Sequence, residues 1–321
     1  MIIGGAGYLG SILCRELLSR GYKVRVLDCL MYGDVGIKDL YDNTNFEFIK
    51  GDIRNIQNVM DSMNGVDAVI HLAAIVGDPA SQIDEDKTIE INYLSTKIIS
   101  WACRYYNIDK FIFASTCSVY GDSSQGMILT EESPTNPLSL YAKMKYKSEI
   151  GLLKESSKSF SPIILRMGTL YGVSPRMRFD LVINLFVIKA YIDKTLKIFG
   201  GQQERCFCHI KDAANAYINC LESDLDLVGN QIFNVASSNL KISDLGRIIV
   251  NNIKPTKLEI DDMLIDNRSY MTTSKKLIDR VKWNPMYDIE YFINNINPND
   301  WIDYKNPIYD NYKYIKNGER N

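Results

Sequence analysis

The chain has 321 residues, of which 46% are hydrophobic and 24% are charged, a balance typical of a globular protein and not of a disordered one. Its 37 basic and 39 acidic residues leave a formal net charge of −2, which excludes the basic excess that a nucleic-acid partner requires. There is no signal-peptide pattern and no apolar run of about 18 residues, so we expect a cytoplasmic protein with no membrane partner.

The seven cysteines are dispersed and odd in number, which favours free thiols in a reducing compartment over a disulfide framework. Cys206, Cys208 and His209 lie close together and raise the question of a metal. Their spacing alternates along an expected strand, and no second ligand pair accompanies them. We therefore expect no metal site.

The first half of the chain alternates short apolar stretches with amphipathic ones. Expected helices cover residues 8–20, 88–106 and 139–157, and expected strands cover residues 1–3, 23–27, 46–49, 66–71, 110–115 and 162–166. This alternation predicts an α/β fold with a Rossmann-type, doubly wound parallel sheet. Only three residues precede Gly4, so a first strand of ordinary length would need residues upstream of Met1.

The pattern becomes less regular after residue 166, where prolines and paired glycines separate short elements. We expect residues 1–166 to form the dinucleotide-binding domain, which also receives parts of the later chain. Residues 167–300 are expected to form mainly a smaller, mixed α/β substrate lobe. Residues 301–321, rich in Asn, Tyr, Lys and Asp, are expected to be a tail that wraps the surface or frays.

Three glycines, Gly4, Gly7 and Gly10, follow the first expected strand and open the first helix in the pattern G-x-x-G-x-x-G. Such a turn brings backbone against a pyrophosphate, and the helix N-terminus at Tyr8 and Leu9 offers unpaired N–H groups to the phosphates. The alternative is a tight structural turn, because three glycines alone also fit one. The position between a strand and a helix favours a dinucleotide site.

Asp28 ends the next expected strand. A carboxylate there accepts hydrogen bonds from adenine-ribose hydroxyls and repels a 2′-phosphate. No arginine follows it directly, so NAD is favoured over NADP. Asp52 and Ile53, after the third strand, would lie around the adenine. The alternative for Asp28 is a solvated aspartate at a strand end.

Tyr141 and Lys145 are four residues apart on an expected helix, which puts both side chains on one face. An ammonium beside a phenol favours the phenolate, so Tyr141 is a candidate base for a sugar hydroxyl. Thr116 lies in a run of small hydroxyl residues at the end of a strand, on the edge where ligands bind in such sheets. Alternatively, these are a surface Tyr–Lys pair and an ordinary loop.

These motifs together resemble the extended short-chain dehydrogenase/reductase family, which includes nucleotide-sugar epimerases, dehydratases and reductases. The resemblance spans most of the chain and includes Ser-Thr-x-x-Val-Tyr-Gly at 115–121 and a strand-turn segment at 166–172. It implies that Thr116, Tyr141 and Lys145 are the catalytic triad. It also implies that Leu72, Ala73 and Ala74 line the cofactor and that Asn92 sits behind its nicotinamide half.

In the later chain the resemblance implies phosphate contacts from Asn184, Arg205 and Arg268, and a substrate contact from Ser118. Residues 174–180, which hold Arg176 and Arg178, resemble a subgroup that oxidises C4 of nucleotide-linked sugars, including GDP-heptose 4-dehydrogenases. These two arginines would reach the sugar or its phosphates. The alternative is a helix start after a proline, with solvated surface arginines.

The resemblance also narrows the reaction. Dehydratases carry Asp-Glu directly after the catalytic threonine, and decarboxylases carry a glutamate at the second of these positions, whereas this chain has Cys117 and Ser118. Dehydration and decarboxylation are therefore disfavoured. A 4-epimerase and a 4-dehydrogenase acting on a GDP-, UDP- or dTDP-sugar both remain open. A 4-keto-sugar reductase usually prefers NADPH, and a catalytically dead NAD sensor typically loses the tyrosine or lysine that persists here. Relatives often form homodimers through the helix bearing Tyr141 and the long helix before it.

Overall fold

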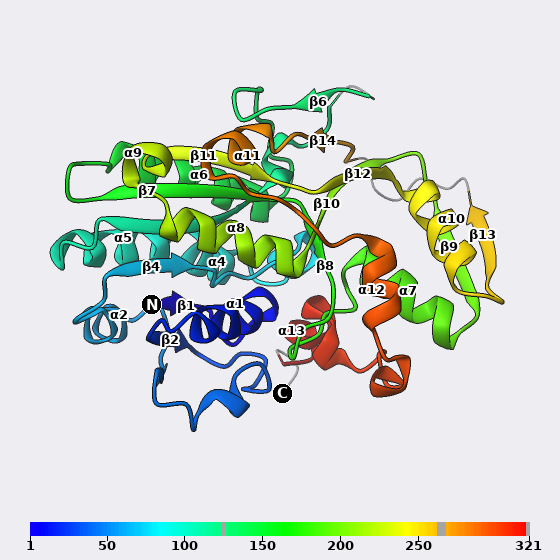
Figure 1. The fold of residues 1–321 in the computed structure, drawn as a ribbon, viewed down its shortest axis with the longest axis horizontal. Coiled ribbons are helices and arrows are strands. Elements are labelled where there is room, and N and C mark those ends of the chain that lie inside the picture. Colours follow the sequence, from blue (N-terminus) through cyan, green and yellow to red (C-terminus); the bar gives the residue numbers. More distant parts are fainter. Residues whose placement is uncertain (124–125, 262–267, 319–321) are drawn as a thin grey trace.

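The computed structural model describes residues 1–123, 126–261 and 268–318. Its centre is a seven-stranded sheet in the order β11-β7-β5-β4-β1-β2-β3, in which every neighbouring pair is parallel (Figure 1). The strands are β1 (Ile2–Ile3), β2 (Val24–Asp28), β3 (Phe46–Lys50), β4 (Ala68–His71), β5 (Lys110–Thr116), β7 (Ser161–Met167) and β11 (Gln231–Val235). The strand order reverses direction between β1 and β4, which opens a crevice at the carboxyl edge.

Helices cover both faces of this sheet because successive strand residues point to opposite sides. On β5, Ile112 packs in one core, whereas Phe111 and Phe113 pack in the other. The first core includes α1 (Tyr8–Ser19) and α8 (Ile210–Glu222), and the second includes α2 (Ile56–Met63), α5 (Ser95–Tyr105) and α6 (Leu140–Lys154). The predicted Rossmann-type, doubly wound fold is confirmed.

The expected helix over residues 88–106 is interrupted by a change in winding. It consists of α4 (Glu85–Ile89), a π-helical segment (Glu90–Leu94) and α5. Such segments often mark functional sites because they re-aim a side chain, and here the segment contains the buried Asn92. The first strand is as short as the sequence predicts.

Small sheets and further helices lie beside the main sheet. The sheets contain β8 (Thr169–Tyr171), β10 (Glu204–His209) and β12 (Ser238–Lys241); β9 (Thr195–Phe199) and β13 (Lys257–Asp261); and β6 (Ile128–Leu129) and β14 (Met271–Thr272). The helices are α7 (Val182–Ile192), α9 (Leu225–Val228), α10 (Ile242–Asn252), α11 (Lys275–Val281) and α12 (Ile289–Asn295). Of these elements, α7, α10, α12, β9 and β13 lie at the right of Figure 1, and β6 and β14 lie at its top. Because β11 and α8 join the main sheet, the later chain contributes to both regions.

The described end of the chain does not fray, contrary to that part of the expectation. Residues Asn311–Gly318 form α13, which packs on the short helix α3 (Asp78–Ser81) that follows β4. Ile315 is buried in the core that also holds β4 and β5. One polar surface of this tail faces solvent, but its apolar face completes the main domain.

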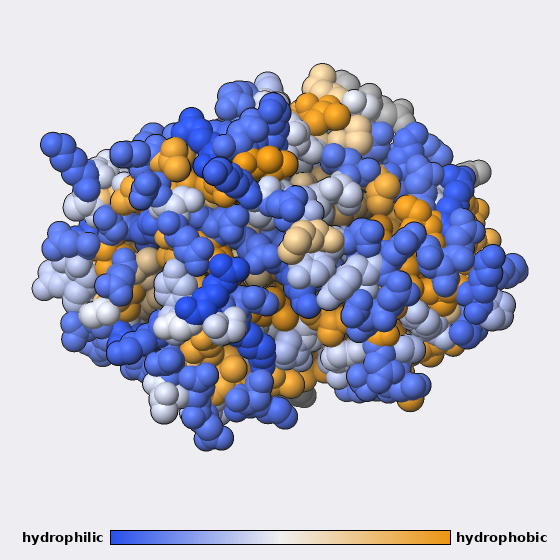
Figure 2. Space-filling view, viewed as in Figure 1, coloured by the Kyte–Doolittle hydropathy of each residue, from blue (hydrophilic) through white to orange (hydrophobic). Residues whose placement is uncertain are grey.

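The outer surface is mainly hydrophilic, with apolar residues showing over α10 and β9 in Figure 2. In the part of the chain that the structure describes, no helix is long and apolar enough to cross a membrane.

Candidate active site

A large cleft follows the carboxyl edge of the main sheet. One side, here called the sheet wall, consists of the turn after β1, the ends of β2, β3, β4 and β5, and the start of α6. The other side, here called the facing wall, consists of Gly168, Thr169, Leu170, Arg176, Arg178, Asp180, Leu181, Arg205, Arg268, Tyr270, Asn311 and Tyr312. Nineteen of the predicted site residues line the cleft: Gly4, Gly7, Tyr8, Leu9, Gly10, Asp28, Asp52, Ile53, Leu72, Ala73, Ala74, Thr116, Ser118, Tyr141, Lys145, Arg176, Arg178, Arg205 and Arg268.

The turn after β1 can be built only with glycine at its first and last motif positions. Gly4 has a φ of +87°, and a Cβ there would lie 2.6 Å from the backbone nitrogen of Ala73. A Cβ on Gly10 would lie 2.4 Å from the carbonyl oxygen of Gly4. The turn thus needs glycine to bring β1, α1 and the loop after β4 together, and this packing leaves the N-terminus of α1 open to the cleft.

Asp28 is held at the end of β2 by two backbone donors. Its Oδ2 accepts from the N–H of Ala6 at 3.0 Å, and its Oδ1 accepts from the N–H of Leu30 at 2.8 Å. Burial raises the pKa of Asp28, and these two hydrogen bonds oppose the rise. Each oxygen retains a further lone pair, so the carboxylate can accept from a ribose hydroxyl in the cleft. Asp52, also on this wall, forms an ion pair with Arg54.

The three predicted catalytic side chains meet at the end of β5. Thr116 ends that strand and accepts a hydrogen bond from the N–H of Ser118 at 3.1 Å. Its hydroxyl also lies near Tyr141 and lowers the pKa of that phenol. Ser139 begins α6 by accepting from the N–H of Ala142, which places Tyr141 in the first helical turn. Lys145 lies one turn further on, with its Nζ 4.7 Å from the ring centre of Phe113.

The protonation of this trio differs from the prediction that Lys145 lowers the pKa of Tyr141. Burial raises the pKa of Tyr141 to about 12, although Arg178 and the Thr116 hydroxyl oppose the rise. Burial also lowers the pKa of Lys145 to about 7, against the influence of Glu149. In the chain without a bound ligand, desolvation therefore changes the pKa values of Tyr141 and Lys145 more than the interaction between these two side chains does.

A buried ion pair fixes the end of β5 from behind. Arg166 on β7 donates to both carboxylate oxygens of Glu149 on α6, with its Nη2 2.7 Å from Oε2. The Ser115 hydroxyl donates to the same carboxylate. Both charged side chains are almost fully buried. Because Ser115 precedes Thr116 and Glu149 follows Lys145 by one turn, this pair links the strand end to the catalytic helix.

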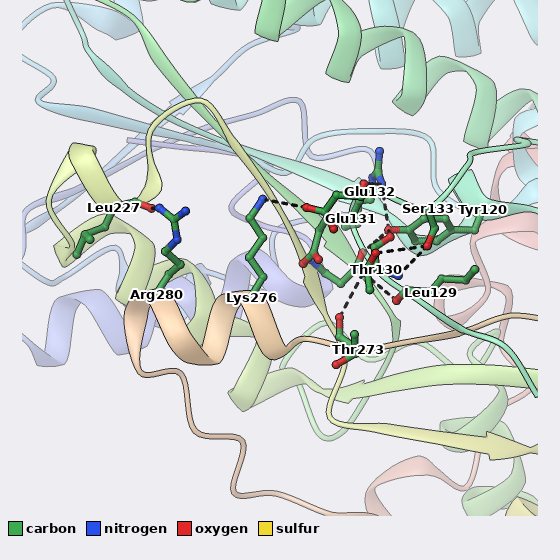
Figure 3. A network of polar contacts seen from close by, with 12 residues as sticks. Tyr120, Leu129, Thr130, Glu131, Glu132, Ser133, Leu227, Thr273, Lys276 and Arg280 are labelled. Carbon is green, nitrogen blue, oxygen red and sulfur yellow. Dashed lines mark hydrogen bonds and ion pairs between the residues drawn. The ribbon is translucent and has the colours of Figure 1, made fainter.

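Arg166 also contacts Tyr120, which belongs to a set of polar contacts with Thr130 and its neighbours that Figure 3 shows. Arg166 donates to the Tyr120 hydroxyl at 3.0 Å, and Tyr120 donates to the carbonyl oxygen of Thr130 at 2.9 Å. Glu132, two residues on, forms a 4.0 Å ion pair with Lys276 of α11. These contacts hold the turn that follows Thr116.

The two residues after Thr116 point in different directions. The Cys117 thiol is fully buried and donates to the carbonyl oxygen of Arg166 at 3.2 Å, so it does not line the cleft. Ser118 does line the cleft, and its hydroxyl lies 3.2 Å from that of Tyr270. Neither position carries a carboxylate.

The predicted arginines enter the cleft from the facing wall. Arg205 donates to the carbonyl oxygens of Glu204 and Arg268, and its guanidinium carbon lies 5.2 Å from the ring centre of Tyr270. Arg268 forms an ion pair with Asp78 of α3, across the cleft. Arg178 forms an ion pair with Asp180 at 2.6 Å.

The structure places two predicted contact residues outside the cleft lining. Asn184 was expected to meet a phosphate, but it is fully buried and its amide bonds the N–H of Gly172, the Tyr8 hydroxyl and the carbonyl oxygen of Arg178. Asn92 bonds both the N–H and the carbonyl of Ile75. The amides of both asparagines are occupied by backbone groups. Their role in this structure is therefore to hold backbone segments near the cleft.

Sequence reasoning missed several residues of the cleft. Tyr217 on α8 reaches the lining with a hydroxyl that has no hydrogen-bond partner among the described residues. Tyr32, Tyr270, Asn311 and Tyr312 also line the cleft. No motif spacing marks these positions, because they come from segments that only the folded chain brings together.

The residues that the structure describes contain no group of three His, Cys, Asp or Glu side chains placed to hold a metal ion. All seven cysteines are free thiols.

Comparison with known proteins defines the class. A model of the NAD-dependent epimerase/dehydratase family matches residues 1–236, and the chain therefore belongs to that family. It is accordingly an NAD-dependent enzyme of the nucleotide-sugar epimerase/dehydratase type, as its motifs predict.

Individual relatives agree with this class. An uncharacterised UDP-glucose epimerase of Bacillus subtilis, YtcB, is 33% identical over 222 residues, which cover 66% of this chain and 69% of that protein. A UDP-glucose 4-epimerase of Lacticaseibacillus casei is 28% identical over 89% of this chain and 92% of its own length. The crystal structure of UDP-glucuronic acid 4-epimerase from Bacillus cereus, in complex with UDP-glucuronic acid and NAD, has a TM-score of 0.82 at 26% identity and 98% coverage of both chains.

The cleft fits NAD by its own geometry. The turn at Gly4 and Gly10 leaves room only for backbone, and the N-terminus of α1 lines the cleft, where its N–H groups suit a diphosphate. Asp28 offers lone pairs for a ribose. The buried hydroxyl of Tyr217 is a further polar group on the lining.

Proposed function

We propose that the protein uses NAD to oxidise C4 of a nucleotide-diphospho-sugar, with Tyr141 as the base. The observation that supports this most directly is the shared position of Thr116 and Tyr141. Both side chains line the cleft that the glycine turn also lines, and the Thr116 hydroxyl lies near enough to Tyr141 to lower the pKa of its phenol. Lys145 lies on the same helix face and the same cleft.

NAD, when bound, accepts the hydride that leaves C4. Tyr141 takes the proton of the C4 hydroxyl, while Thr116 holds the reacting oxygen beside the phenol. Because burial keeps the phenol protonated at neutral pH, additional positive charge is needed to favour the phenolate. The Lys145 ammonium, on the same helix and cleft, would supply part of that charge, and oxidised NAD would supply a further positive charge when bound.

A 4-epimerase acting on a UDP-sugar is our first candidate. The two relatives are named as a UDP-glucose epimerase and a UDP-glucose 4-epimerase, and the similar solved structure is a UDP-glucuronic acid 4-epimerase. The buried Cys117 and the hydroxyl of Ser118 provide no carboxylate for expelling a C6 hydroxyl. Ser118, Arg205 and Arg268 are the proposed contacts to the sugar and its diphosphate.

A 4-dehydrogenase acting on a GDP-heptose is the second candidate. The observation in its favour is the segment at residues 174–180, which resembles that subgroup and whose Arg176 and Arg178 line the cleft. The two candidates share the first hydride transfer. They differ in whether the hydride returns to the sugar.

The deciding experiment follows the hydrogen at C4. The NAD-loaded protein is incubated with UDP-glucose, UDP-glucuronic acid, dTDP-glucose and a GDP-heptose, each carrying deuterium at C4, and the products are identified by NMR. An inverted alcohol that keeps the deuterium indicates the epimerase, and a 4-ketone with deuterium on the nicotinamide indicates the dehydrogenase. If NAD binds but none of these sugars is changed, the proposed substrate class is wrong.

We also propose a cytoplasmic homodimer. The free thiols favour a reducing compartment. Leu94, Trp101 and Tyr105 are exposed at positions that share one helix face, and Ile150 is exposed on the neighbouring α6. Sedimentation should give a dimer for the native chain and a monomer for Trp101→Glu, whereas the exposed Met286→Glu should leave the dimer intact. A native monomer contradicts the proposal.

A further inference from the structure

Arg176 is a buried arginine on the facing wall with an incomplete set of partners. Arg176 is only 3% exposed, and it lines the cleft. Its Nη2 donates to Asn311 Oδ1 of α13 at 2.7 Å, and its guanidinium lies 4.1 Å above the ring of Tyr32. Its Nε has no hydrogen-bond partner among the described residues.

The charge of Arg176 also lacks a counter-charge at ion-pair distance within the described chain. Arg178 lies nearby, but Asp180 forms its ion pair with Arg178. Burial, followed by the charge of Arg178, lowers the pKa of Arg176 to about 10. A buried, unpaired guanidinium is unfavourable, so this position is suited to receive an anion.

The backbone around Arg176 is anchored to the first turn of α1. The Tyr8 hydroxyl donates to the carbonyl oxygen of Gly172 at 2.6 Å, and the Ser174 hydroxyl donates to the carbonyl oxygen of Tyr8 at 2.8 Å. Arg176 follows two residues after this anchor. Its charge also acts on Asp28 at the end of β2. Arg176 therefore belongs to a segment that is fixed to the start of α1, and it lines the same cleft as Asp28.

A second unpaired donor accompanies it. The Tyr32 hydroxyl is buried without a hydrogen-bond partner among the described residues, and the Tyr32 ring packs 5.1 Å from that of Tyr314. Asn311, which holds Arg176, also donates to the carbonyl oxygen of Val76 at 3.5 Å, in the loop after β4. Arg176, Tyr32 and Asn311, here called the Arg176 cluster, thus join three separate segments over the cleft.

We propose that Arg176 binds the diphosphate of the dinucleotide from the side opposite the glycine turn, with Asn311 positioning its guanidinium. The glycine turn and the N-terminus of α1 fix where that diphosphate lies, and the Arg176 cluster is anchored to the same helix end. The proposal changes the predicted role of Arg176, which was contact with the sugar substrate. It depends on the cofactor alone and not on which sugar is oxidised.

The test measures ligand binding without any reaction. Protein stripped of dinucleotide is titrated by calorimetry with ADP-ribose and with UDP, and adenosine binding is followed by NMR. A charge-assisted hydrogen bond contributes enough that Arg176→Met should weaken ADP-ribose binding about 10- to 100-fold. Adenosine, which has no phosphate, and UDP should bind as to the native protein.

Three further variants separate binding from folding. Arg176→Lys should recover part of the ADP-ribose affinity. Asn311→Ala keeps the charge of Arg176 but removes its hydrogen-bond partner, and should lower the ADP-ribose affinity several-fold. Arg247→Met, at an exposed arginine of α10, is the matched control and should bind all ligands normally. Because Arg176→Met removes an unpaired buried charge, its melting temperature without ligand should be unchanged or higher.

Two results would overturn the proposal. If Arg176→Met weakens UDP binding and spares ADP-ribose, the arginine serves the substrate. If ADP-ribose and adenosine lose affinity equally while the melting temperature falls, the arginine is structural. Neither result would bear on the proposed sugar oxidation, which the deuterium experiment tests separately.

Discussion

The two walls of the cleft are built in different ways. The sheet wall consists of strand ends and helix starts whose positions are set by regular parallel pairing, such as the end of β5 at Thr116 and the start of α6 at Tyr141. The facing wall is assembled from short segments near residues 176, 205, 268 and 311, tied by individual polar contacts. The sheet wall provides the reacting groups, and the facing wall provides the charges around them.

Removing the reacting phenol is the sharpest test of the sheet wall. Tyr141→Phe should reduce kcat about 10³-fold, because a positioned base contributes on this order, while NAD binding should persist. The measurement is turnover of the substrate identified by NMR, with cofactor binding followed in parallel. Tyr146→Phe, on the same helix, is the control and should remain active. Turnover that survives Tyr141→Phe would remove this phenol from the mechanism.

Breaking the buried ion pair tests whether the sheet wall depends on support from behind. Glu149→Gln leaves Arg166 without a counter-charge in the core and should lower the free energy of unfolding by about 3 kcal/mol. Urea unfolding measures this. Glu222→Gln, which removes an exposed pair with Arg20, should change it by less than about 1 kcal/mol. Equal effects of the two changes would contradict the assigned role.

Acid should lower the folding stability through the two histidines of the chain, one in the main sheet and one in a small sheet. His71 lies on β4 of the main sheet and His209 ends β10, and burial lowers the pKa of each, to about 3 for His209. Below pH 6.5 the unfolded chain binds protons that the folded chain does not, so stability falls as the pH falls. Between pH 6.5 and 5 this amounts to about 2 kcal/mol for His209.

The variant that checks this is His209→Gln, with thermal unfolding measured from pH 7 to pH 5. Its stability should fall less steeply over that range than that of the native protein. An unchanged slope would show that His209 is not kept neutral in the folded state.

The sheet wall was largely predictable from sequence because its residues occur in local motifs. Gly4, Asp28, Thr116 and Tyr141 each sit at the end of an element that periodicity reveals, and parallel strands bring their ends to one edge. The same reasoning predicted the Rossmann-type fold, which the structure confirms. It could not determine protonation, because the burial that raises the pKa of Tyr141 arises from the packed structure.

The facing wall was predictable only in part. Arg176, Arg205 and Arg268 were recognised as cleft residues through resemblance, but their partners Asn311, Tyr270 and Asp78 carry no motif. Asn184 was assigned to a phosphate, whereas its amide is needed by buried backbone. Such long-range pairings depend on where irregular segments meet, which local patterns do not specify.

The cleft, which α13 helps to line, has a consequence for the lifetime of the enzyme. A dinucleotide held between both walls adds its binding free energy to folding, about 2.7 kcal/mol when its concentration is 100 times its Kd. We therefore expect proteases to degrade the enzyme more slowly when NAD is abundant, so that the metabolic state of the cell would govern how much of it accumulates.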